Sequence, residues 1–158
     1  SRGLGDVYKR QTNTTTLKTM NTNNKATNAQ MSALNHNITL AHAEISMANR
    51  LIELARRAQK TGREHIFLKV FDDNFGPEYD EFTIDVLIDT YTALIIDRET
   101  DILFPAEQDR HATAQTKYPT DDHARYWINQ EFTTYLEKTT FMNNLLNKID
   151  EAWDDINA

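Results

Sequence analysis

Apolar residues recur at alternating spacings of three and four between residues 30 and 61. This spacing places them on one stripe of an α-helix, and Gly62 follows as a helix stop signal. The pattern therefore predicts one long N-terminal helix over 30–61. The positions on this stripe are Met31, Leu34, Ile38, Ala41, Ile45, Ala48, Ile52 and Ala55.

The middle of the chain has a different pattern, with short apolar runs separated by turn-forming and acidic residues. Residues 65–71 form one such run and are predicted to be a strand. Residues 82–89 alternate apolar and polar side chains, which is typical of a half-buried strand. Two further runs flank the polar turn 97–101 and predict a hairpin over 94–104. A helical face also fits 82–96, but the Thr, Ile and Val content of this segment favours a strand.

A near-heptad spacing of apolar residues follows a polar connection over 105–120. Thr120 or Asp121 is suited to cap the helix that begins there, because a short polar side chain can accept hydrogen bonds from its first backbone N–H groups. We expect one or two C-terminal helices, with a break at Thr139-Thr140. The sequence thus predicts an α+β fold with a long N-terminal helix, a small antiparallel β-sheet and one or two C-terminal helices.

The first 29 residues lack any such pattern, because Thr and Asn dominate and apolar residues are scarce. A stretch of this composition cannot bury enough apolar surface to fold, so 1–29 is predicted to be a disordered tail. The first eleven residues resemble the translated read-through of a sequencing adapter and are interpreted as non-native. Residues 30–158 are then expected to form a single α+β domain.

Acidic charge is concentrated in one segment of the chain. Ten acids and one base, Arg98, lie between residues 72 and 101, which gives −9 where the whole chain has −7. Because these acids alternate with strand-like residues, they predict a folded acidic surface that suits a basic partner. The partner-binding residues predicted on this surface are Asp85, Asp89, Asp97, Glu99 and Asp101.

A basic cluster precedes the acidic segment. Residues 50–63 hold five bases against Glu53, a net +4. Such a cluster suits phosphate contacts, but no aromatic residue is interleaved and the overall charge opposes nucleic acid. A contact with the acidic segment, within the molecule or in a partner, is the equal alternative. The members of the basic cluster are Arg50, Arg56, Arg57, Lys60 and Arg63.

No catalytic or metal-ligating pattern is present in the sequence. Cysteine is absent, so zinc–thiolate sites and thiol catalysis are excluded. The histidines have no metal-ligand spacing, and the four glycines form no phosphate-binding loop. Asp97-x-Glu99-x-Asp101 begins like a calcium loop, but Ile102 and Gln108 stand where that loop requires glycine and glutamate. We therefore predict no catalytic residue, no metal and no cofactor.

These features predict a small soluble protein that is not an enzyme and that binds a protein partner with a basic surface. Its size and Asn/Thr-rich composition suggest an inhibitor or adaptor of the kind that phages and mobile elements encode. The alternatives are a divalent-metal-dependent hydrolase that uses the Asp/Glu cluster and a nucleic-acid-binding protein that uses residues 50–63. No apolar run approaches the ~20 residues of a membrane span, and a cytoplasmic location is expected.

Overall fold

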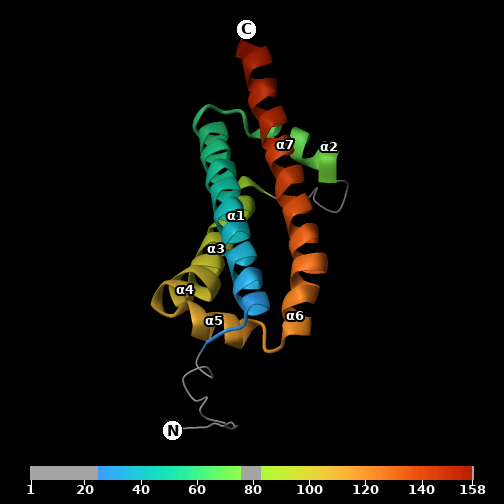
Figure 1. Ribbon diagram of the computed structural model, residues 1–158. Helices are drawn as coiled ribbons and strands as arrows, with labels where there is room; N and C mark the ends of the chain where they lie inside the picture. Colours follow the sequence, from blue (N-terminus) through green and yellow to red (C-terminus); the bar gives the residue numbers. More distant parts are fainter. Residues whose placement is uncertain (1–24, 76–82, 158) are drawn as a thin grey trace, which may run out of the picture.

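The computed structural model describes residues 25–75 and 83–157, and its three long helical segments run up, down and up (Figure 1). The first segment is α1 (Asn28–Lys60). The second combines α3 (Ile84–Arg98), the π-helical η3 (Glu99–Leu103) and α4 (Phe104–Gln108). The third combines α6 (Asp121–Tyr126), the π-helical η4 (Trp127–Phe132) and α7 (Thr133–Asn157). The shorter α2 (Glu64–Phe75) lies beside α7, and α5 (Arg110–Lys117) joins the second segment to the third.

No strand occurs among the described residues, so the predicted α+β fold and its antiparallel sheet are wrong. The run 65–71 belongs to α2, and the predicted strand 82–89 and hairpin 94–104 belong to the α3–η3–α4 segment. A strand would bury Ile84 and Val86 on the same side. Instead, Ile84 and Leu87 are buried, and Val86 is 42% exposed, which is helical periodicity.

The burial of large side chains explains why helix prevails over strand in these runs. Phe67 and Phe71 are one helical turn apart, both are buried, and their ring centroids lie 6.2 Å apart. Burying a side chain of this size contributes about 1.5–3 kcal/mol. Differences in β-propensity span only about 1 kcal/mol, so they are overridden when the helical face is the one that packs.

The predicted helix over 30–61 is confirmed as α1, which begins and ends at clear signals. Thr27 accepts a hydrogen bond from the N–H of Gln30 (3.2 Å), and the Gln30 side chain accepts one from the N–H of Thr27 (2.8 Å). These two bonds form a capping box. Gly62 has φ 72°, a left-handed conformation that glycine adopts at little cost, and it ends the helix.

Only a small part of the predicted tail 1–29 can be placed. Asn28 and Ala29 already belong to α1, and Thr27 caps it. Residues 1–24, which include the eleven interpreted as non-native, lie outside the described residues.

The predicted C-terminal helix is confirmed, but it has no break at Thr139-Thr140. Both threonine hydroxyls donate to backbone carbonyls one turn earlier, at 3.0 Å each, so the helix accommodates them. Thr120 caps α6 as predicted, by accepting a hydrogen bond from the N–H of His123 (3.1 Å). Most of the predicted connection 105–120 is itself helical.

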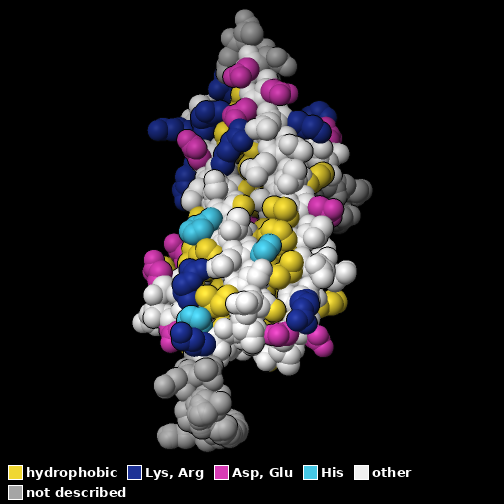
Figure 2. Space-filling model, viewed as in Figure 1, with side chains coloured by type: hydrophobic (Ala, Val, Ile, Leu, Met, Phe, Trp, Pro, Cys, Tyr) yellow, Lys and Arg dark blue, Asp and Glu magenta, His cyan; other side chains and the backbone are white. Residues whose placement is uncertain are grey.

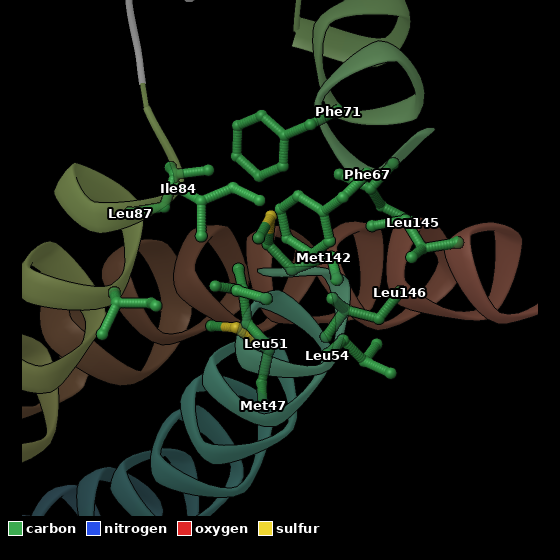
Figure 3. Packing of buried hydrophobic residues seen from close by; sticks show 14 of the residues in the cluster. Met47, Leu51, Leu54, Phe67, Phe71, Ile84, Leu87, Met142, Leu145 and Leu146 are labelled. Carbon is green, nitrogen blue, oxygen red and sulfur yellow. The ribbon is translucent and has the colours of Figure 1, made fainter. Parts of the chain in front are cut away.

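The helices bury two hydrophobic clusters. The first lies where α1, α2, α3 and α7 meet, and Figure 3 shows side chains from these helices pointing toward one another. It includes Met47, Leu51, Leu54, Phe67, Phe71, Ile84, Leu87, Met142, Leu145, Leu146 and Ile149. The second lies at the other end of α1 and includes Leu34, Leu40, Ala114, Tyr118 and Trp127. Within the described ranges, no helix has both the length and the hydropathy needed to cross a membrane.

Tyr118 is the buried polar side chain of the second cluster. Its phenolic oxygen accepts a hydrogen bond from the Asn37 amide (2.8 Å), and its backbone carbonyl accepts one from Gln30 (2.7 Å). Burial raises the pKa of Tyr118 to about 12, although the bond from Asn37 opposes this shift.

Candidate interaction surface

The predicted acidic surface is one side of a helix rather than the face of a sheet. Asp85, Asp89 and Asp97 are exposed along α3, on the side away from its buried residues. Val86 and Ile96 lie among them and are 42% and 56% exposed. This side of α3, which we call the α3 outer face, therefore mixes carboxylates with aliphatic side chains.

Arg98, the single base of the acidic segment, is directed away from the α3 outer face. Its Nε donates to Glu44 Oε1 of α1 (2.7 Å), and a second nitrogen lies 3.3 Å from Glu44 Oε2. Glu44 is only 7% exposed, and the hydrogen bond to it raises the pKa of Arg98 above its ordinary value. Because α3 has no other Lys or Arg, its outer face carries negative charge without a compensating base.

The structure does not keep all five predicted partner-binding residues together. Asp101 forms an ion pair with Lys117 of α5 (2.9 Å), and Glu99 is half-buried in η3. These two residues therefore belong to the corner between the second helical segment and α5. The other three predicted residues make up the acidic part of the α3 outer face.

Nothing in the described residues assembles the acidic side chains into a metal centre. No group of three His, Asp or Glu side chains in that part of the chain could hold a metal ion. The residues that begin like a calcium loop, Asp97, Glu99 and Asp101, follow one another at every second position of a helical segment. Side chains two residues apart on a helix point in different directions, so they do not converge on one point.

The basic cluster is divided by contacts with α7. Arg50 and Arg57 both bind the carboxylate of Asp150, Arg57 at 3.1 Å, and Arg50 also donates to Asn147 (2.9 Å). The guanidinium of Arg57 lies 4.5 Å from the centroid of the Trp153 ring. Basic and acidic side chains are correspondingly interleaved near the upper end of the view in Figure 2.

The remaining bases of the cluster lie on different sides of α1 and its end. Arg56 and Lys60 are exposed, whereas Arg63 is half-buried after the turn at Gly62. The acidic partner of Arg50 and Arg57 is Asp150 of α7. Arg50 and Arg57 thus join α1 to α7.

A groove that the sequence did not predict lies between α1, α3 and α7. It has a volume of about 540 Å³, and its walls include Glu44, Met47, Tyr91 and Tyr135. Residues 133–138 of α7 are all exposed beside it, between the two hydrophobic clusters. The one sequence feature that indicates this groove is Thr139, a polar residue at an apolar position of the near-heptad, which lies in the groove wall.

No family model, curated protein or solved structure matches this chain. The functional argument therefore depends on the chemistry and geometry of the described surfaces.

Proposed function

We propose that this chain is a non-enzymatic interaction protein whose α3 outer face binds a basic amphipathic helix of a protein partner. The observation that carries the proposal is the inward direction of Arg98. Because Glu44 holds Arg98 against α1, Asp85, Asp89 and Asp97 face outward with no base among them. The absence of cysteine suits a reducing setting such as the cytoplasm.

The spacing of the acids supports a helical partner. Asp97 lies twelve positions after Asp85, a rise of about 18 Å along α3. A partner helix of similar length would bring Lys or Arg beside these carboxylates and aliphatic side chains beside Val86 and Ile96. Recognition of an amphipathic helix along one face is a common mode of protein binding.

Electrostatic complementarity of this kind predicts moderate, salt-sensitive affinity. Each exposed ion pair contributes about 0.2–1 kcal/mol, so the three carboxylates together supply roughly 1–3 kcal/mol. Exposed charges are screened beyond about 8 Å at physiological ionic strength. Removal of the carboxylates should therefore weaken binding by about tenfold or more, and added salt should reduce the difference.

A binding measurement with a defined probe tests the proposal. The probe is a synthetic amphipathic helix with lysines on one side and leucines on the other, and its affinity is measured by fluorescence anisotropy. The test variant is D85N/D89N/D97N. Asparagine can still accept the hydrogen bond that Gln59 donates to position 85, so the local contact survives.

A matched control separates the α3 outer face from net charge. The variant E53Q/E107Q/E151Q also removes three exposed carboxylates, from α1, α4 and α7. We expect the control to bind the peptide like the unchanged chain, and D85N/D89N/D97N to bind it about tenfold more weakly. Equal affinities of the two variants, or no binding by the unchanged chain, would overturn the proposal.

A further inference from the structure

The imidazole of His111 joins α5 to the residues in front of α1. His111 is half-buried, and its Nδ1 accepts a hydrogen bond of 3.0 Å from the backbone N–H of Ala26. The two residues lie 85 positions apart in the sequence, and α5 packs beside the start of α1 (Figure 1). This contact involves no residue of the α3 outer face.

The direction of this hydrogen bond fixes the protonation state of the ring. A backbone N–H can only donate, so the Nδ1 of His111 is the unprotonated nitrogen of a neutral imidazole. His36 is the opposite case, because its Nδ1 lies 2.7 Å from the carbonyl of Ser32, which can only accept. Protonation of the ring therefore preserves the bond of His36 and abolishes that of His111.

The bond from Ala26 is the first of several contacts that hold the beginning of α1. Ala26 packs against the second hydrophobic cluster, and Thr27, which caps the helix, also donates its hydroxyl to a carboxylate of α6. Gln30 donates to the carbonyl of Tyr118 (2.7 Å), and neither of these groups titrates. Loss of the His111 bond would therefore free the residues in front of Thr27 while the later contacts keep α1 in place.

We propose that His111 is a pH-sensitive latch, which holds the segment before α1 against α5 when its imidazole is neutral and releases that segment when the imidazole is protonated. Histidine is the side chain whose charge ordinarily changes between about pH 5 and 8. An imidazolium has two N–H donors and no acceptor, so it cannot keep the bond from Ala26. The contact is thus complete above the pH range in which histidine titrates and is lost below it.

Charged residues around this contact influence the pH at which the latch opens. The acidic ones favour the protonated ring and the basic ones oppose it. Two of them are engaged elsewhere, since Asp109 accepts from the N–H of Ala112 (3.0 Å) and Arg110 binds Asn35 of α1. The charged residues on the elements around the contact are Lys25 before α1, Glu107 of α4, Asp109 and Arg110 at the start of α5, and Asp121 of α6.

Nuclear magnetic resonance of the unchanged chain tests the proposal directly. At about pH 8 the ring of His111 should carry its hydrogen on Nε2, whereas that of His36 should carry it on Nδ1. As the pH is lowered to about 5, the backbone amide of Ala26 should shift with the same midpoint as the His111 ring. The amide of Val86 is the internal reference, because it donates to the Thr83 hydroxyl (3.2 Å), a bond that does not titrate.

Hydrogen exchange measures how strongly the latch holds. After correction for the intrinsic effect of pH on exchange, protection of the Ala26 amide should fall by about threefold to tenfold between about pH 7.5 and 5.5. A change of this size corresponds to the loss of one hydrogen bond.

Two substitutions at position 111 separate the acceptor from the ring. In H111N the side-chain oxygen is as many bonds from the backbone as Nδ1 and accepts at every pH, so the Ala26 amide should stay protected without a pH response. H111F keeps an aromatic ring without an acceptor, and the amide should be unprotected throughout. H36N is the matched control and should leave the pH response of Ala26 unchanged.

Three results would overturn the proposal. The first is a hydrogen on the Nδ1 of His111 at about pH 8, and the second is an Ala26 amide that does not follow the titration of the His111 ring. The third is a pH response of H111N equal to that of the unchanged chain, which would assign the response to another group such as Asp121.

Discussion

Removal of Arg98 should destabilise the protein by about 3 kcal/mol. In R98M, the carboxylate of Glu44 loses both hydrogen bonds and stays at a position where the residue is only 7% exposed. Breaking a fully buried ion pair from one side costs about 3–5 kcal/mol. The Arg98 side chain is 25% exposed, which places this pair at the lower end of that range.

The opposite substitution should cost less because the two partners differ in burial. In E44Q the glutamine still offers an acceptor, and Arg98 can reach solvent, so we expect a loss of about 1–2 kcal/mol. The double variant E44L/R98M removes both charges and should be less destabilised than R98M alone. Urea unfolding followed by circular dichroism measures all three differences.

A surface pair provides the control, and the peptide assay provides a functional check. Lys69 and Asp73 also form an ion pair on one helix (3.1 Å), but both are largely exposed, so K69M should change stability by less than about 0.5 kcal/mol. R98M should retain the peptide affinity of the unchanged chain, because Arg98 does not lie on the α3 outer face. Equal and additive losses for E44Q and R98M would refute the reasoning.

Three further perturbations have expected outcomes. Tyr118 has a folded-state pKa of about 12 against about 10 unfolded, so its contribution is complete below pH 10. The contribution of Tyr118 to the free energy of unfolding should fall by about 2–3 kcal/mol as pH rises from 10 to 12. Alkaline unfolding of the unchanged chain, compared with that of Y118F, measures this loss. G62A should cost about 1 kcal/mol in urea unfolding, since φ is 72° there although the space around it is open. L146A should lower the free energy of unfolding by about 2–5 kcal/mol, because Leu146 is fully buried, whereas V86A on the exposed side should change it by less than about 0.5 kcal/mol.

The sequence alone located the two long terminal helices. Their apolar stripes extend over many turns, and a period that is repeated so often cannot be fitted by a strand. The ends were also marked locally, by Gly62 after α1 and by Thr120 before α6. Capping and positive φ depend on residues within one turn of each other, so these features need no knowledge of the rest of the fold.

The middle of the chain was assigned wrongly because its runs are short. The run 65–71 is only seven residues long, and over 82–96 the same residues fit a helical stripe and an alternating strand. The Thr, Ile and Val content of 82–96 favoured the strand. Packing against α1 and α7 decided in favour of helix, since that is the conformation that buries Phe67, Ile84 and Leu87 together. Such contacts join residues far apart in the chain and leave no local pattern.

The acidic excess between residues 72 and 101 was determined by the sequence itself, because formal charge is a property of composition. Which of these carboxylates lie on α3 without a neighbouring base was decided by tertiary structure. Arg98 binds Glu44, which lies 54 positions away in the sequence, and this contact directs Arg98 away from the α3 outer face. Arg57 binds Asp150, which lies 93 positions away. The physical reason is that the field of a surface depends on the direction of each side chain, and long-range pairing sets that direction.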